Sequence, residues 1–350
     1  MAPITTEITK LFGIQHPILL AGMNVAAGPE LAAAVTNAGG LGVIGGVGYT
    51  PKFLRQQIEL IKKDLKDPNA PFGVDLLIPQ VGEGARKTNY DYTKGSLSEL
   101  IDVIIEEGAK LFVCAVGVPP VEVVERLHKA GIPVMNMIGH PKHIQKALAR
   151  GVDIICAQAG EGGGHTGDIP FGILIPACLD ELKGKKSPLT GKQVPLIAAG
   201  GISDGRGLAA ALAYGAQAVW VGTRFVASVE AGAPKAHKEA ILSAGYGDAV
   251  RTLIFTGRPL RVRRTPYVEN WEKNRQEEIK ELTSQGEVPF EVDLAKNPKV
   301  MSEGRSFLLG EVSAVIKDIK PAKQIVDEMV AEAVEKLRAA GSLLQERSRL

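Results

Sequence analysis

The sequence has few cysteines, few aromatic residues and almost no excess of charge of either sign. Its three cysteines, Cys114, Cys156 and Cys178, show no Cys-x-x-Cys spacing, so we expect neither a disulfide framework nor a metal site. Aromatic residues make up 5% of the chain and the net charge is +2, so nothing favours a nucleic-acid partner. No uncharged apolar run approaches the ~18 residues of a membrane helix. The N-terminus also has no signal-peptide pattern, so we expect a cytoplasmic protein without membrane contact.

Glycine, by contrast, is abundant and unevenly distributed. The chain has 40 glycines, and 32 of them lie in residues 1–222, where several end short apolar runs. There are eight such runs, at 17–23, 41–46, 72–77, 111–117, 133–139, 153–160, 195–201 and 218–225. They are apolar throughout rather than alternating, which is typical of parallel strands buried on both faces.

Amphipathic segments of helical period follow most of these runs. They lie at 29–39, 51–65, 96–108, 121–131, 141–151 and 203–216, and residues 321–341 provide an eighth helix. Eight strand–helix units predict an α/β fold of the (β/α)8 TIM-barrel type rather than an open doubly wound sheet. A functional site is then expected at the C-terminal ends of the strands.

Two stretches interrupt the repeat, after the third and the eighth strand. Residues 78–95 are too long for an ordinary strand–helix loop, and residues 226–310 are rich in charge. We predict that together they form a smaller, mostly helical lid or substrate domain. The barrel would then consist of residues 1–77, 96–225 and 311–350.

The glycine-rich loop after the sixth strand is the strongest functional feature. It runs from Gln158 to Gly167, and His165 and Thr166 lie near its end. Its glycines allow the backbone to approach a ligand closely, and its successive N–H groups can bind an anion. A histidine on this face of a barrel is a candidate catalytic residue. The alternative is a flexible loop with an incidental surface histidine.

The turns after the seventh and eighth strands are of a type that binds phosphate. Gly200 and Gly201 end one strand, and Gly222 and Thr223 end the next. In barrels these two loops commonly hold a phosphate beside a helix N-terminus. Tight turns without a ligand are the alternative interpretation.

Three further features are open to two interpretations each. Met23 could lie against a flat ring or fill core space. Asp75, inside a buried strand, needs as its partner either a ligand N–H or a neighbouring lysine or arginine. The cluster Arg261, Arg263 and Arg264 is by default a solvated face, and binding of an anion is the second interpretation.

These motifs together resemble the nitronate monooxygenase family, formerly called 2-nitropropane dioxygenases. The resemblance rests on Ala-Gly-Met at 21–23, Gln-x2-Glu-x-Gly-Gly-His-x-Gly at 158–167, Ala-Gly-Gly at 199–201 and Gly-Thr-Arg-Phe at 222–225. It runs over essentially the whole chain. It implies non-covalently bound FMN and oxidation of alkyl nitronates or nitroalkanes by O2 to carbonyl compounds and nitrite.

The resemblance also implies roles for individual residues. His165 matches the catalytic histidine of the family, and Asp75 stands where members often have an asparagine that bonds the flavin. Cofactor contacts are implied for Ala21, Gly22 and Met23 beside the ring, for Gln158 and Gly163, and for Gly200, Gly201, Trp220, Val221, Gly222 and Thr223 around the phosphate.

Other functions share most of these motifs. The first alternative is an NAD(P)H-dependent FMN reductase of the same superfamily, resembling the enoyl-acyl-carrier-protein or quinone reductases. The second is a non-catalytic flavin-binding module. Association into a homo-oligomer stays open. The last residues, Ser348-Arg349-Leu350, are one conservative change from a peroxisomal address, so a peroxisomal location is expected beside the cytoplasm if the source is eukaryotic.

Overall fold

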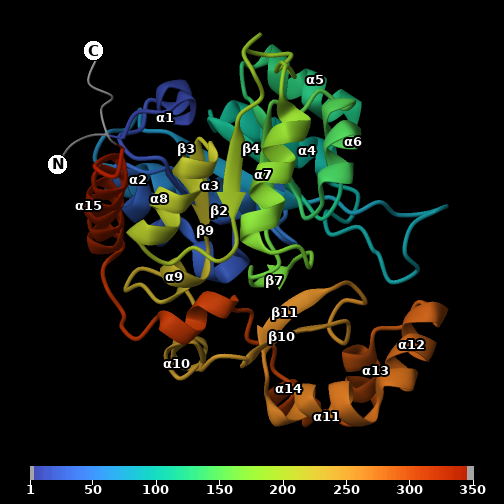
Figure 1. Cartoon of the computed structure of the whole chain (residues 1–350). Helices are drawn as coiled ribbons and strands as arrows, with labels where there is room; N and C mark the ends of the chain where they lie inside the picture. Colours follow the sequence, from blue (N-terminus) through green and yellow to red (C-terminus); the bar gives the residue numbers. More distant parts are fainter. Residues whose placement is uncertain (1–3, 345–350) are drawn as a thin grey trace, which may run out of the picture.

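Eight parallel strands form a barrel in the computed structural model, which describes residues 4–344 (Figure 1). The strands are β1 (Ile18–Leu20), β2 (Gly42–Gly45), β3 (Phe72–Leu77), β4 (Leu111–Ala115), β5 (Val134–Ile138), β6 (Ile154–Gln158), β8 (Leu196–Ala199) and β9 (Ala218–Val221). They pair in the order β1-β9-β8-β6-β5-β4-β3-β2, and a bridge between Leu19 and Leu41 joins the two ends. The predicted TIM barrel is therefore confirmed.

Both faces of the strands are buried, which explains why their sequences do not alternate. Leu19, Leu111 and Ile197 belong to a cluster that fills the barrel interior. Neighbouring residues such as Leu20 and Phe112 pack outward against the helices. The three cysteines are free and buried, two of them on barrel strands and Cys178 on a helix.

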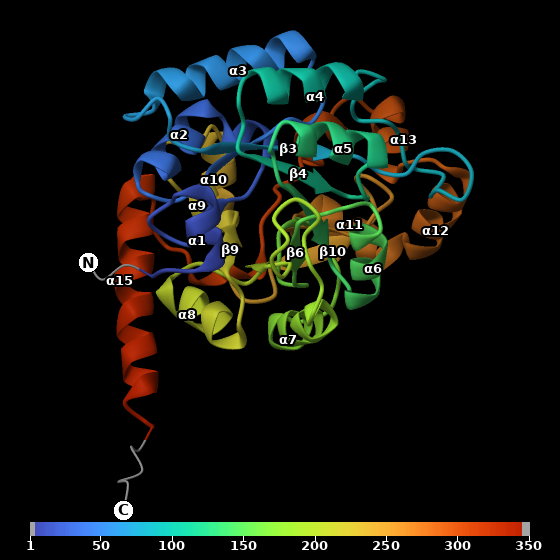
Figure 2. The same cartoon turned by 90° about the horizontal axis from the view of Figure 1, so that it is seen from above.

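Helices surround the strands, as the view from above shows (Figure 2). They are α2 (Pro29–Asn37), α3 (Pro51–Asp64), α4 (Leu97–Glu106), α5 (Val121–Lys129), η2 (Pro141–His143) continuing into α6 (Ile144–Leu148), α7 (Phe171–Leu182), α8 (Gly205–Tyr214) and α15 (Ala322–Gly341). All the predicted helical segments contain a helix. The helix α7 was missed because Pro176 interrupts an almost uniformly apolar segment.

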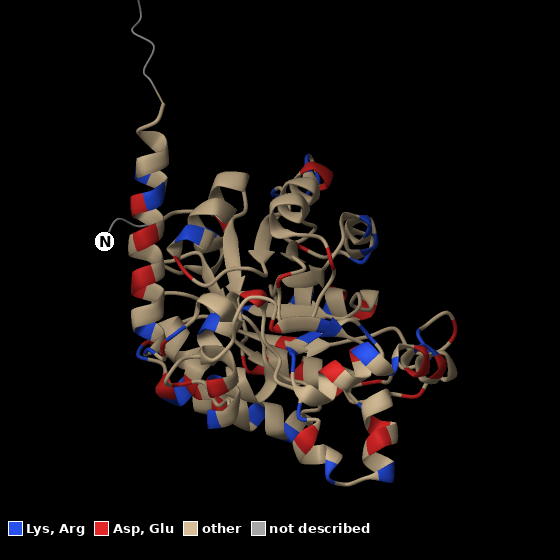
Figure 3. Cartoon of the chain, turned by 60° about the horizontal axis from the view of Figure 1, so that its bottom comes forward, with Lys and Arg blue, Asp and Glu red and all other residues tan. Residues whose placement is uncertain are grey.

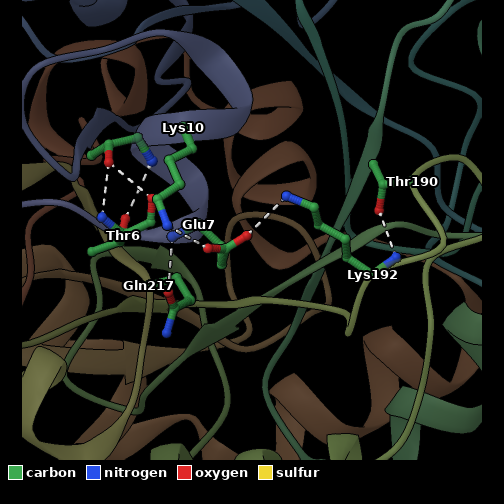
Figure 4. A network of polar contacts seen from close by, with 7 residues as sticks. Thr6, Glu7, Lys10, Thr190, Lys192 and Gln217 are labelled. Atoms are coloured by element: carbon green, nitrogen blue, oxygen red, sulfur yellow. Dashed lines mark hydrogen bonds and ion pairs between the residues drawn. The ribbon is translucent and has the colours of Figure 1, made fainter.

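A short N-terminal helix closes the end of the barrel opposite the strand C-termini. Helix α1 (Glu7–Phe12) inserts Ile8 and Phe12 into the interior cluster. Glu7 fixes its position, because its backbone N–H donates to Gln217 Oε1 at 3.1 Å and its carboxylate lies 3.1 Å from Lys192 Nζ (Figure 4). Helix α1 therefore covers this end of the barrel with apolar side chains.

The long insertion, residues 226–310, lies below the C-terminal ends of the strands in Figure 1. It contains α10 (Lys235–Leu242), β10 (Ala249–Thr252), β11 (Leu260–Arg263), α11 (Pro266–Asn274), α12 (Gln276–Gln285), α13 (Pro289–Lys296) and α14 (Val300–Glu303). The two strands join β7 (Gly164–His165), from the loop after β6, in a small antiparallel sheet. The sequence pattern did not predict this sheet, since it indicated a mostly helical segment.

The short insertion, residues 78–95, has no helix or strand and packs against the long one. A β-carbon on Gly257 would lie 2.3 Å from Thr88 Oγ1, so the two segments are in close contact. Asn89 Oδ1 also accepts a hydrogen bond from Arg258 Nη1 at 3.2 Å. The two insertions therefore form one layer over the barrel, and its action as a lid stays a prediction.

The distribution of charge is mixed over the described part of the molecule. Basic and acidic residues alternate over the face seen in Figure 3, in keeping with the small net charge. Within residues 4–344, no helix has both the length and the apolar character needed to cross a membrane. The Ser348-Arg349-Leu350 ending lies outside the described residues.

Replacement of Gly205 tests the docking of the last helix. A β-carbon there would lie 2.5 Å from Ala333 N and from Met329 O, both backbone atoms of α15. We expect Gly205→Ala to lower the free energy of unfolding by about 1–3 kcal/mol, because rigid backbone must move apart. Urea unfolding measures the change. Gly172→Ala in α7 is the control, since its β-carbon would come no closer than 3.4 Å to Tyr214 Oη. Equal stability of the two variants would contradict the prediction.

Candidate active site

A deep cavity opens at the C-terminal ends of the barrel strands, between the barrel and the two insertions. Its volume is about 1670 Å³, above the ~300–1,000 Å³ that one small-molecule ligand usually occupies. All the predicted site residues except Val221 line it: Ala21, Gly22, Met23, Asp75, Gln158, Gly163, His165, Gly200, Gly201, Trp220, Gly222 and Thr223. The glycine-rich loop after β6, the turns after β8 and β9, the turn after β1 and Asp75 thus surround one space.

The loop after β6 is hydrogen-bonded to itself and to its surroundings. Gln158 Nε2 donates to the carbonyl of His165 at 2.7 Å, so the loop closes on itself. The carboxylate of Glu161 accepts from Phe171 N at 3.0 Å, at the start of α7. A β-carbon on Gly163 would lie 2.7 Å from Gly310 N, so glycine is required where the chain returns from the long insertion. These contacts bind the loop to the barrel and to the returning chain, and they place His165 in the wall of the cavity.

His165 is held from the long insertion as well as from the barrel. Its backbone pairs with Leu260 of β11, and its Nε2 lies 3.1 Å from Thr256 Oγ1. Burial lowers the pKa of His165 to about 4, and the positive charge of Arg258 contributes to the shift. The imidazole is therefore neutral at pH 7 and has one ring nitrogen directed to a hydroxyl.

Arg258 brings a positive charge to the same wall of the cavity. It donates to the Val116 carbonyl at 2.9 Å as well as to Asn89. Burial lowers the pKa of Arg258, but a guanidinium stays protonated at pH 7. It forms no ion pair within residues 4–344. An anionic ligand is the natural partner of a half-buried cation in this position.

Asp75 extends from β3 and has no basic partner. It is 2% exposed, its Oδ1 has no hydrogen-bond partner, and it makes no ion pair with any described residue. The alternative of a neighbouring lysine or arginine is therefore wrong. Burial raises the pKa of Asp75 to about 8. Gly22 makes room for it, because a β-carbon there would lie 2.5 Å from Asp75 Cβ.

Asn136 was missed by sequence analysis and is the second buried group without a full set of partners. It lies in β5 and lines the cavity, and its amide nitrogen donates at 2.8 Å to the carbonyls of Cys114 and Gly117. Its Oδ1 accepts nothing. The sequence feature that could have identified Asn136 is a single asparagine within the apolar run at 133–139. Arg258 and Thr256, also missed, lie in the long insertion, where no pattern marks them.

The loops after β8 and β9 lie side by side at the far edge of the cavity. Gly200 and Gly201 have φ of +82° and +71°, which side chains disfavour, and a β-carbon on Gly200 would lie 2.7 Å from Ala159 O. Thr223 begins the short helix α9 (Thr223–Val226), and its Oγ1 accepts from Gly310 N at 2.9 Å.

Two strand residues near this edge have different environments. Trp220 belongs to the barrel-interior cluster, whereas the Val221 side chain packs outward among the helices. Only the backbone of Val221 points toward the neighbouring strand, where its carbonyl accepts from Ala21 N at 2.9 Å. Met23 is partly buried, and a β-carbon on Gly222 would lie 3.3 Å from its sulfur.

The arginine cluster of β11 is mostly structural, which corrects its interpretation as a solvated face. Arg261 is 9% exposed. Its Nε donates to Gly160 O at 3.0 Å and its Nη1 lies 3.0 Å from Glu311 Oε1. Arg261 therefore connects the long insertion to the loop after β6 through this hydrogen bond. Arg263 pairs with Asp248, and Arg264 is exposed.

The fold and this cavity place the protein in the TIM-barrel class, with its candidate site at the C-terminal ends of the strands. A sequence model described as nitronate monooxygenase matches residues 5–332, so the chain belongs to the nitronate monooxygenase family. It is an oxidoreductase family whose members generally depend on a flavin.

Individual relatives differ in what their names say they do. The chain is 31% identical to a (3aS,4S,5R,7aS)-5-hydroxy-7a-methyl-1-oxo-octahydro-1H-indene-4-carboxyl-CoA dehydrogenase of Mycobacterium tuberculosis, over 98% of this chain and 99% of that protein. The solved structure of FabK from Thermotoga maritima has a TM-score of 0.78 and 32% identity, covering 97% of this chain and all 100% of that one. A nitroalkane oxidase of Streptomyces ansochromogenes has a TM-score of 0.77 and 28% identity, over 95% and 99% of the two chains.

The raised pKa of Asp75 predicts a pH-dependent stability of the ligand-free protein. Between pH 3.8, the usual pKa of an aspartate, and about pH 8, the folded state keeps a proton that the unfolded state releases, so stability falls as pH rises through this window. Asp75→Asn should remove this slope and raise the free energy of unfolding at pH 7 by about 1–3 kcal/mol.

Urea unfolding at pH 5 and pH 8 measures the slope. Asp64→Asn, at an exposed carboxylate of α3, is the control and should keep the slope of the parent protein. A parent slope that survives in Asp75→Asn would show that another group carries it.

Proposed function

We propose that this protein is an FMN-dependent nitronate monooxygenase, which oxidises alkyl nitronates with O2 to carbonyl compounds and nitrite. The observation that carries the proposal is the pairing of a neutral His165 with the Arg258 cation on one cavity wall. A nitronate is a small anion whose two oxygens accept hydrogen bonds. A cation beside a neutral donor is the complement of such a substrate.

The residues of the cavity fit a flavin. Asp75 Oδ1 and Asn136 Oδ1 are buried without partners, and both line the cavity. The pyrimidine edge of a flavin alternates carbonyl acceptors with an N–H donor. A protonated Asp75 supplies one donor and one acceptor, and Asn136 supplies an acceptor, so a flavin edge would satisfy what the protein leaves unpaired.

The other predicted contacts divide between the two ends of this cofactor. Gln158 and Gly163, with the Ala21-Gly22-Met23 turn, would hold the ring. Gly200, Gly201, Gly222 and Thr223 would hold the phosphate, because their loops follow the seventh and eighth barrel strands. The Trp220–Val221 segment would support that end through the backbone of β9.

When bound, FMN supplies the redox chemistry that takes electrons from the nitronate and delivers them to O2. The protein's own residues orient the substrate. Arg258 attracts the nitronate charge, and an N–H of the neutral His165 imidazole donates to one of the nitronate oxygens. With a neutral nitroalkane as substrate, the neutral imidazole of His165 would accept the α-proton, and Arg258 would stabilise the negative charge that develops on the nitro oxygens as the proton leaves.

Replacement of His165 tests its role. We expect His165→Asn to lower the rate of nitrite release about 100-fold or more, because proton transfer and a substrate hydrogen bond are lost together. FMN content, read from the visible spectrum, should stay unchanged because His165 is not among the predicted flavin contacts. Full nitrite release in the variant would remove His165 from the mechanism.

Replacement of Arg258 tests the electrostatic part. Arg258→Gln should raise KM for a nitronate about tenfold, since a charge-assisted contact contributes about 1.5–3 kcal/mol. Arg258→Lys keeps the charge and should keep KM within a few-fold. Arg264→Gln, at an exposed cation outside the cavity, is the matched control. If Gln and Lys at position 258 raise KM equally, the charge is not the recognised feature.

The second candidate is an FMN-dependent reductase or dehydrogenase with a larger substrate. It is supported by the likeness to the carboxyl-CoA dehydrogenase over nearly the whole chain and by a cavity larger than a small nitronate needs. Anaerobic mixing separates the two candidates. Bleaching of the flavin by a nitronate but not by NAD(P)H supports the monooxygenase, and the reverse supports the reductase.

A further inference from the structure

A row of three basic side chains lies along one edge of the cavity. Lys142, Lys146 and Arg150 follow β5, on η2, on α6 and just beyond it. Their spacing of four residues places them on one face of a continuous helical path. We call these three residues the basic strip. All three line the same cavity as His165.

The basic strip is not neutralised by the protein. Its side chains make no ion pair and no hydrogen bond to any residue between 4 and 344, and all three are exposed. The cavity-facing Arg251, by contrast, lies 3.6 Å from a carboxylate of Asp168. Glu122 of α5 lines the cavity too, but it forms no ion pair with the strip.

Positive charge also acts on His143, beside the strip. His140 caps η2 through its Nδ1, and its ring centroid lies 5.9 Å from that of His143. Burial lowers the pKa of His143, and the charges of Lys142 and Lys146 lower it further. This end of the cavity therefore favours an anion and disfavours any further cation.

The strip begins beside the candidate catalytic loop. Gly139, at the end of β5, packs so closely on Gly167 that a β-carbon would lie 3.1 Å from Gly167 N. Gly167 is two residues from His165. From Lys142 to Arg150 the strip extends on the order of 12 Å, at ~1.5 Å per residue. The strip therefore starts three residues after a segment that packs on the loop of His165.

We propose that the basic strip binds the phosphate groups of a nucleotide-bearing second ligand, whose reactive end reaches His165. The cavity has the volume for such a ligand in addition to a flavin. Three cations at regular intervals match several phosphates joined in one molecule better than a single carboxylate. Two sources share this chemistry, a coenzyme A thioester and a reduced pyridine nucleotide. The site goes beyond nitronate oxidation, which requires no nucleotide.

Calorimetric titration of the full-length protein, with its cofactor content recorded from the visible spectrum, tests the proposal. The probes are coenzyme A, NADPH and inorganic phosphate. The double variant Lys146→Gln/Arg150→Gln removes two strip charges. Lys66→Gln/Lys129→Gln removes two exposed charges that lie outside the cavity, and so matches the change in net charge.

We expect at least one nucleotide to bind the parent protein, with a dissociation constant raised about tenfold in the strip variant and less than about twofold in the control. Higher salt should weaken binding in the parent more than in the strip variant. Binding of coenzyme A alone would identify the thioester as the source, and binding of NADPH alone the pyridine nucleotide.

Three results would overturn the proposal: no binding of either nucleotide, equal losses in the two double variants, or binding of inorganic phosphate as tight as that of the nucleotides. Nitrite release from a small nitronate is measured separately on the parent protein. Its absence alongside tight nucleotide binding would reject the proposed nitronate reaction and leave the strip proposal intact.

Discussion

The close backbone approach of Gly163 to Leu309 and Gly310 holds the barrel and the long insertion together. A β-carbon on Gly163 would lie within 3.0 Å of both residues, so the contact exists only because this position lacks a side chain. On either side of it, Glu161 O accepts from Glu311 N at 2.9 Å and Gly310 N donates to Thr223. The loop after β6 and the start of α9 therefore share one hydrogen-bonded junction with the chain returning to α15.

Because of this junction, the candidate site belongs to neither layer alone. The backbone of His165 comes from the barrel side, but its strand partner and its hydroxyl partner Thr256 come from the long insertion. Arg258, two residues further on, bonds the carbonyl of Val116, a barrel residue held at a φ of +69°. The geometry of the histidine thus depends on how the layers dock, and a shift of the insertion would move the imidazole and the cation together.

Sequence patterns predicted the barrel because parallel strands buried on both faces consist of short apolar runs, which can be recognised from neighbouring residues alone and several of which end in glycine. The cavity glycines and His165 were predictable for the same reason, since strand ends converge in a barrel. Arg258 and Asn136 were not, because their roles arise from contacts between distant segments. The interpretation of Arg261 as solvent-exposed was wrong for a related reason. Its hydrogen-bond acceptor, the carbonyl of Gly160, is about 100 residues away in the sequence and comes close only in the folded protein.

Although the net charge of the chain is small, the charged groups that line the cavity are unevenly distributed. Its one fully buried carboxyl group, Asp75, is protonated at pH 7 by the effect of burial, and the imidazole of His165 is neutral. The charges that remain near the candidate reacting groups include Arg258 and the basic strip, which no described carboxylate neutralises. An anionic ligand therefore gains attraction at both places without repulsion from Asp75. Protonation of that carboxyl follows from its burial, and recognition of anions follows from the cations that no carboxylate pairs in the same cavity.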